Sequence, residues 1–302
     1  MKLILTTVLA LMVAMPALAE GPPSRVEQGM MRIELTGSQR MLSQRILRNT
    51  CFIVAGLGEQ DLVDEIAGDV AAFDKATETV LEGDETLGLQ PERSPIIRSD
   101  YNDRILLPWQ AMRIEALAVA ARGIAAPADI AELPLRSESM LADLNAAVAH
   151  YEEKYSRGSR LSPELSRTAN VYARQRMLSV RIAAMTCLIS VGMGNEQTVE
   201  ALRDSYATMA AAYSDMAEGN VDQRIIAAPD VALPLIRCGS EALASIRPHV
   251  ETALSGTPLD QAALGEVLRA SQMLMALSQE SVSVFEAHIT GSELPTASCA
   301  GA

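Results

Sequence analysis

Aromatic residues are scarce in this chain: three phenylalanines, one tryptophan and six tyrosines make up 3% of its 302 residues. Runs of β-branched residues are also rare, whereas alanine, leucine and methionine are abundant. Strands draw on β-branched and aromatic residues, and helices on alanine, leucine and methionine. The composition therefore predicts an all-α fold.

The sequence also lacks the motifs of common enzymes and metal sites. We find no nucleophile beside a base, no glycine-rich phosphate loop and no motif around paired carboxylates, so we expect neither enzymatic activity nor a cofactor. His150, His249 and His288 are scattered, and no cysteine–histidine spacing is typical of zinc or c-type haem. The fifteen methionines fall among leucines at helical spacing, which favours core packing over copper binding. We expect no metal site.

Basic residues are outnumbered, with 25 lysines and arginines against 38 acidic residues and a net charge of −13. Nucleic-acid binding needs a basic face, so nucleic acid is not an expected partner. Lys2, the apolar run LILTTVLALMVAM and the small residues at 17–19 predict a signal peptide over residues 1–19 and export to the periplasm. The alternative is an uncleaved anchor, although this run is shorter than the ~20 residues of a membrane span. No other segment is expected to cross a bilayer.

One arginine-bearing segment occurs twice. Residues 37–58, GSQRMLSQRILRNTCFIVAGLG, align without a gap with residues 173–194, ARQRMLSVRIAAMTCLISVGMG, and twelve of the twenty-two positions are identical. Further matches follow in order along the chain: EGD at 82–84 with EGN at 218–220, and YEEKY at 151 with FEAHI at 285. Self-similarity at this period predicts a tandem duplication.

Each copy is predicted to form four helices, with glycine, proline and polar residues marking the breaks. The expected helices are 25–56, 59–82, 97–123 and 136–156 in the first copy, and 164–192, 196–218, 231–254 and 259–289 in the second. The expected domains are 20–157 and 164–290, joined by a linker at 158–163 and followed by a tail at 291–302. The simplest architecture is two tandem up-down four-helix bundles.

The repeated arginine marks a second face on each first helix. On a helical wheel these faces hold Arg40, Gln44, Cys51 and Ala55 in the first copy, and Arg176, Val180, Cys187 and Val191 in the second. Parallel packing of the two helices would make a pseudo-twofold dimer with Arg40 and Arg176 near its axis. A small oxyanion between the two guanidinium groups would offset their repulsion. Alternatively, each arginine reaches water or pairs with a carboxylate such as Glu34.

Arg45 and Arg181 lie on the opposite side of the wheel from Arg40 and Arg176. They are predicted to be surface residues or to form salt bridges between helices.

The segment ELTGSQRMLSQRI resembles the N-terminal signature of the periplasmic sensor domain shared by the pilus chemotaxis transducer PilJ and the nitrate/nitrite sensor kinase NarX. The resemblance implies a four-helix bundle that dimerises through its first helix. In the nitrate sensors, the arginine before the methionine binds nitrate or nitrite, which carries over to Arg40 and Arg176. The second copy departs from the motif at Ala173 and Arg174, where the first has Gly37 and Ser38.

The resemblance implies a sensor-like function without its own signalling part. No kinase or methyl-accepting region follows the second copy, so a protein that senses would report to a partner. The alternative function is a structural or interaction protein of the cell envelope that binds no small molecule.

The four cysteines suit an oxidising compartment. Cys51 lies eleven residues beyond Arg40, which is three helical turns, and Cys187 has the same relation to Arg176. Parallel first helices would bring the two cysteines level, which predicts a Cys51–Cys187 disulfide. The tail is expected to reach back to the third helix of the second copy, which predicts Cys238–Cys299. The alternative is that Cys51 and Cys187 are buried free thiols.

Overall fold

The computed structural model describes residues 23–58, 60–156, 163–293 and 299. Within these ranges the regular structure is helical, apart from two isolated β-bridges, so the predicted all-α fold is confirmed. No helix of the described ranges is long and apolar enough to span a membrane. The predicted leader, residues 1–19, lies outside the described residues.

The helices follow the predicted order closely. The first part of the chain forms α1 (Arg25–Val54), α2 (Gln60–Glu82), α3 (Pro95–Asp100), a π-helical turn (Tyr101–Leu106), α4 (Leu107–Arg122) and α5 (Leu133–Ser156). The second part forms α6 (Pro163–Ser190), α7 (Glu196–Glu218), α8 (Leu233–Ser245), α9 (Arg247–Leu254) and α10 (Gln261–Thr290). Short 3-10 turns occupy Glu85–Leu87 and Pro127–Ile130.

Two of the predicted helices are interrupted. The helix expected at 97–123 contains the π-helical turn just before Pro108, and the one expected at 231–254 breaks at Ile246, just before Pro248. A proline in a helix has no N–H to donate, and its ring clashes with the carbonyl four residues earlier. The π-helical turn and the break accommodate these two prolines.

Local capping explains where the long α1 begins. The Ser24 side chain accepts a hydrogen bond from the backbone N–H of Glu27 at 3.3 Å, and the Glu27 carboxylate accepts one from the backbone N–H of Ser24 at 2.6 Å. This reciprocal arrangement satisfies two N–H groups that the helix itself leaves unpaired.

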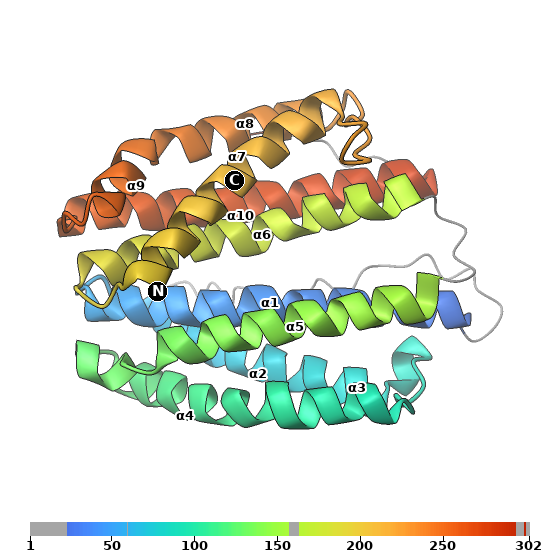
Figure 1. Cartoon of the computed structure of the whole chain (residues 1–302), viewed down its shortest axis with the longest axis horizontal. Helices are drawn as coiled ribbons and strands as arrows, with labels where there is room; N and C mark the ends of the chain where they lie inside the picture. Colours follow the sequence, from blue (N-terminus) through green and yellow to red (C-terminus); the bar gives the residue numbers. More distant parts are fainter. Residues whose placement is uncertain (1–22, 59, 157–162, 294–298, 300–302) are drawn as a thin grey trace, which may run out of the picture.

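The long helices run roughly along the long axis of the molecule and lie in layers, as Figure 1 shows. Helix α1 packs against α2 and α5, and α2 packs against α4. Helix α6 packs against α7 and α10, and α8 packs against α10. Helices α1 and α6 also pack against each other, side by side and in the same direction across the middle of the molecule (Figure 1). The arginine-bearing helices therefore meet at the centre of the structure.

The loops after α2 and α7 have the same local structure, 136 residues apart. Each closes with an isolated β-bridge, Asp84 with Leu89 in the first and Asn220 with Ile225 in the second. These are the loops in which the sequence aligns EGD with EGN.

Both predicted disulfides are present. Cys51 and Cys187 join α1 to α6 with their Cα atoms 6.1 Å apart, and both residues are fully buried. Cys238 on α8 is joined to Cys299 with a Cα separation of 6.2 Å. The alternative that Cys51 and Cys187 are free thiols is wrong, because all four cysteines are paired. Such pairing is consistent with a location outside the cytoplasm.

We expect the double variant Cys51→Ala/Cys187→Ala to lose stability but keep its helical content. The bond joins residues 136 positions apart. By restricting the unfolded chain, a loop of this length stabilises the folded state by about 5 kcal/mol at most. Urea unfolding monitored by circular dichroism would measure the loss. Cys238→Ala/Cys299→Ala is the matched control and should cost less, because that bond closes 61 residues and lies nearer the surface. Equal stability of the first variant and the native protein would contradict the expectation.

Candidate functional site

Arg40 projects from α1 with its side chain half-buried. Its Nη1 donates a hydrogen bond to Oδ1 of Asn145 on α5, at 2.9 Å. Gly37 lies under the same guanidinium, and a Cβ at that position would come within 3.3 Å of Nη2. The bonding partner is a neutral amide, so this contact leaves the positive charge of Arg40 uncompensated.

Arg176 occupies an equivalent setting on α6. Its Nη1 donates to Oε1 of Gln279 on α10 at 2.7 Å, and its Nε donates to the carbonyl of Ala173 at 3.4 Å. Gln279 follows Asn145 by 134 residues, the offset that relates YEEKY at 151 to FEAHI at 285. The two amides were not singled out from the sequence, although this offset would have paired them.

Arg40 lies near two further arginines, of which Arg176 has the smaller influence on it. Burial lowers the pKa of Arg40, and the neighbouring guanidinium groups of Arg174 and Arg176 lower it further, while Glu152 acts in the opposite direction. Arg174 is one of the residues at which the second copy departs from the sequence motif. Here it adds a third positive charge beside Arg40.

Carboxylates act on two of the three arginines, Arg40 and Arg176, whereas burial and the positive charges of Arg167 and Arg181 lower the pKa of Arg174. Burial lowers the pKa of Arg176, whereas Glu34 and Glu286 raise it. Glu286 follows Glu152 by 134 residues, so each motif arginine is influenced by a glutamate at the equivalent position. Glu34, which the sequence suggested as a partner of Arg40, instead acts on Arg176. Both motif arginines are thus bonded to a neutral amide and lie near carboxylates.

Arg45 and Arg181 form the predicted salt bridges between helices. Arg45 holds Asp69 of α2 through two hydrogen bonds, of which the one from Nε is 2.7 Å long. Arg181 on α6 holds Glu138 of α5 through two bonds, of which the one from Nε is 3.2 Å long. Burial raises the pKa of Asp69, and the bond from Arg45 opposes that rise. These arginines join helices and are not exposed at the surface.

Arg48 is a buried charge that the sequence analysis did not identify. Its side chain is fully buried, and burial lowers its pKa to about 10 despite the opposing charge of Glu65. It donates to Asn49 Oδ1 at 2.8 Å, to Glu65 of α2 at 3.0 Å and to Ser271 of α10 at 3.4 Å. The second copy has Ala184 at the matching position, so no repeated pattern drew attention to Arg48.

The histidines lie outside any candidate metal cluster. Nδ1 of His150 lies 3.2 Å from Asp100, and Nε2 of His249 lies 2.7 Å from Glu266. His288 is exposed near the end of α10. Among the residues that the structure describes, no group of three or more histidine, cysteine or acidic side chains could hold a metal ion.

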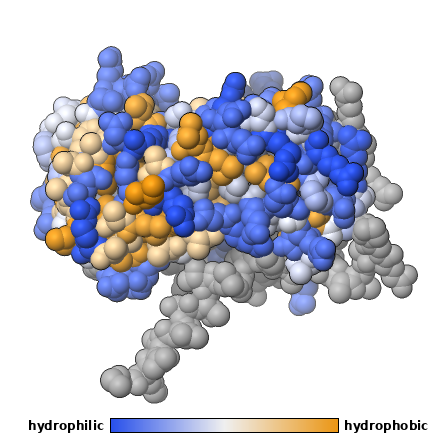
Figure 2. All heavy atoms as spheres, turned by 90° about the horizontal axis from the view of Figure 1, so that it is seen from below, coloured by the Kyte–Doolittle hydropathy of each residue, from blue (hydrophilic) through white to orange (hydrophobic). Residues whose placement is uncertain are grey.

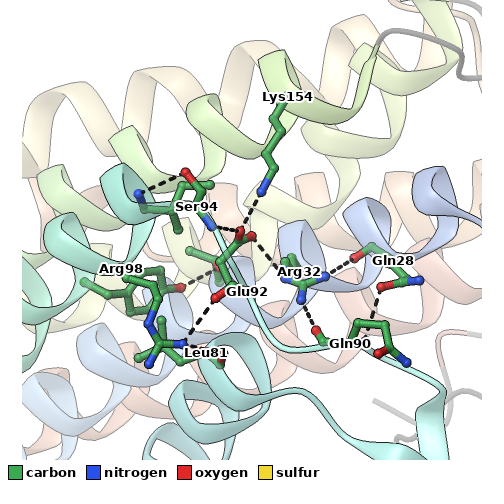
Figure 3. A network of polar contacts seen from close by, with 11 residues as sticks. Gln28, Arg32, Leu81, Gln90, Glu92, Ser94, Arg98 and Lys154 are labelled. Carbon is green, nitrogen blue, oxygen red and sulfur yellow. Dashed lines mark hydrogen bonds and ion pairs between the residues drawn. The ribbon is translucent and has the colours of Figure 1, made fainter.

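A second polar cluster surrounds the buried carboxylate of Glu92, as shown in Figure 3. Oε1 of Glu92 accepts hydrogen bonds from Lys154 Nζ at 2.6 Å and from the backbone N–H of Ser94 at 2.7 Å. Oε2 lies 3.5 Å from Nε of Arg32, whose Nη2 donates to the carbonyl of Gln90. Burial alone would raise the pKa of Glu92, but the bonds from Lys154 and Ser94 and the nearby positive charges hold it below its ordinary value.

This cluster is structural, because Oε1 of the carboxylate accepts hydrogen bonds from the protein itself and Oε2 is paired by charge with Arg32. It ties α1 and α5 to the loop between α2 and α3 (Figure 3). The second half lacks these charges: its matching residues are Thr168, Ala228 and His288. There, Thr168 accepts a hydrogen bond from the backbone N–H of Ile226 at 2.9 Å and ties the equivalent loop without an ion pair.

We expect Glu92→Gln to destabilise the protein by about 3 kcal/mol at neutral pH, because it leaves Arg32 and Lys154 without their buried counter-charge. The native pKa of Glu92 is lowered from the ordinary 4.5, so its contribution is present above pH 4.5 and is lost as the pH falls through the native value. The difference in unfolding free energy between variant and native protein should therefore shrink below pH 4.5.

Urea titrations at neutral and acidic pH would measure this difference. Glu78→Gln is the matched control, because Glu78 is exposed and pairs only with the exposed Lys75. That variant should change stability by less than about 1 kcal/mol. If Glu92→Gln lowers the unfolding free energy by the same amount at neutral and acidic pH, the expected pH dependence, and with it the lowered native pKa of Glu92, is contradicted.

Comparison with protein families finds a match in the first part of the chain. Residues 27–132 match the family described as type IV pili methyl-accepting chemotaxis transducer N-term, which agrees with the resemblance noted around Arg40. The predicted second copy, 164–290, lies outside the matched residues and stays a prediction. No curated protein matches the chain. Residues 27–132 are thus similar to the sensor-like N-terminal domain of a chemotaxis transducer.

Proposed function

We propose that the protein is an exported, sensor-like ligand-binding module built from two tandem copies of one domain, residues 20–157 and 164–290. In this proposal the copies are four-helix bundles related by a pseudo-twofold axis between α1 and α6. The repeated sequence, the matching β-bridges after α2 and α7 and the parallel contact of α1 with α6 support it. The similarity of residues 27–132 to a transducer N-terminal domain supports the sensor-like role.

The ligand in this proposal is a small oxyanion, such as nitrate or nitrite, held between Arg40 and Arg176. The observation that carries it is the repeated bond from a half-buried motif arginine to a neutral amide, Asn145 or Gln279. An anion oxygen could replace the amide oxygen at each guanidinium. It would also offset the repulsion from Arg174 and Arg176, which adds to burial in lowering the pKa of Arg40. The nearby glutamates favour an anion of single charge over one of multiple charge.

A partner protein would read the bound state. The ligand would contact both α1 and α6, so binding would change how these two helices, and with them the two copies, pack against each other. Export by the leader 1–19 would place the protein in the periplasm, where its two disulfides suit the oxidising conditions. The alternative is a structural or interaction protein of the cell envelope, which the balance of arginines by Glu34, Glu152 and Glu286 favours, because the charges need no ligand.

The proposal predicts an ion-specific rise in melting temperature. A ligand at 100 times its dissociation constant stabilises the folded state by about 2.7 kcal/mol. Thermal unfolding in millimolar nitrate, nitrite, sulfate and chloride at constant ionic strength would measure it. Nitrate or nitrite should raise the melting temperature more than chloride does.

Three variants make this test specific. Arg40→Ala and Arg176→Ala should each abolish the ion-dependent rise and keep the helical content. Arg203→Ala, at an exposed position on α7, is the matched control and should keep the rise. Equal shifts in all four salts, or a nitrate effect that survives both site variants, would favour the structural alternative.

A further inference from the structure

One face of α4 is apolar although it lies on the surface of the chain. Leu107 and Ile114 are each 67% exposed, and Ile124, just beyond the end of the helix, is 74% exposed. Ala118 and Ala121 lie exposed between them. Figure 2 views the molecule from this side and shows hydrophobic residues gathered in its left half, where the end of α4 and the loop to α5 lie.

The apolar residues of this face, of which Ala111 is half-buried and the others exposed, repeat at the spacing of a helix-pairing seam. Their positions alternate steps of four and three residues: Leu107, Ala111, Ile114, Ala118 and Ala121. Such spacing places apolar side chains in one line along a helix, ready to pack against a second helix. The opposite side of α4 already faces the core through Trp109, Met112, Ala116 and Val119. The seam is thus additional to what the fold of the single chain requires.

The equivalent helices in the second half do not share this feature. The outer side of α8 and α9 is mainly polar, with exposed Arg237, Ser240, Glu241, Ala244 and Arg247. The fold therefore accepts a polar surface at this place. The apolar seam of α4 is particular to the first half.

Charges beside the seam are neutralised within the chain. The ion pairs are Arg113 with Asp74 at 2.9 Å, Arg122 with Asp129 at 3.0 Å, and Arg136 with Glu115. The whole chain carries a net charge of −13, so most approaches of one copy to another meet repulsion. Beside α4 these pairs balance the charge, so two copies that meet there bring no excess of like charge together.

We propose that two copies of this chain associate through α4, with the two helices antiparallel about a twofold axis level with Ala116. Ile114 of each copy then faces Ala118 of the other, and Ala111 faces Ala121. A large side chain meets a small one in the two Ile114–Ala118 pairs beside the axis, and alanine meets alanine further out, so the helices approach closely. A parallel arrangement in register would instead set Ile114 against Ile114 and leave gaps between the alanines.

The face that α4 offers is short. Helix α4 has 16 residues, which makes a contact about 24 Å long. Such an interface lies at the small end of the range for specific complexes, so the dimer forms in a concentration-dependent way. The inference does not rest on the proposed anion site, which lies between α1 and α6.

Sedimentation velocity of the mature chain over a rising concentration series tests the proposal. The native protein should pass from monomer to dimer, and Ile114→Glu should weaken the association on the order of tenfold or more. Val221→Glu is the matched control, because Val221 is 92% exposed in the turn after α7 and should leave the association unchanged. Ile114 is exposed too, so equal melting temperatures would show that both variants fold.

Cross-linking tests the direction of the helices. A mixture of Ile114→Cys protein with Ala118→Cys protein should form a disulfide-linked heterodimer faster than either protein alone forms a homodimer, since the two positions face each other only in the antiparallel pair. A native protein that stays monomeric throughout, or a dimer unaffected by Ile114→Glu, would overturn the proposal. Monomers that bind phosphatidylglycerol vesicles and lose that binding in Ile114→Glu would assign the face to membrane and also overturn it.

Discussion

The parallel contact of α1 with α6 brings charge into the centre of the molecule, and the other helices are arranged to neutralise it. An arginine buried without a partner costs several kcal/mol, so each one fixes the position of a neighbouring helix. Arg45 requires the carboxylate that α2 supplies, and Arg181 requires the one that α5 supplies. Arg48 links α1 to both α2 and α10. The Cys51–Cys187 disulfide then holds the pair of helices together covalently.

Repetition in the sequence made the central contact predictable. Twelve shared identities established which residues are equivalent, and the spacing from Arg40 to Cys51 placed the cysteines level on parallel helices. Asn145 escaped notice because its contact with Arg40 depends on how α5 packs against α1, 105 residues away in the sequence. Arg48 escaped because its burial depends on α10, which lies far away in the sequence. Helix interruptions were missed because periodicity alone does not show how a helix accommodates a proline such as Pro108.

The two halves keep similar helices but differ in how these are held. In the first half, the buried charge of Glu92 gathers groups from α1 and α5 onto one loop. In the second, the hydroxyl of Thr168 ties the corresponding loop with a single hydrogen bond. A buried ion pair often stabilises no more than a well-packed apolar replacement, so its loss in one half need not change the fold. The two halves therefore differ in buried charge at corresponding loops, although each loop is tied to its neighbouring helix.

The position of the Cys51–Cys187 bond limits how α1 and α6 can move relative to each other. The bond lies near the C-terminal ends of both helices, and Arg40 lies eleven residues earlier, about 16 Å along the axis. A covalent bond at one end opposes translation of either helix along its axis relative to the other. It still permits the free ends to swing apart or together, with the disulfide as the pivot. Arg40 and Arg176 lie between the disulfide and the N-terminal ends of α1 and α6. A small change in the distance between these arginines would therefore go with a larger change in the distance between the two N-terminal ends.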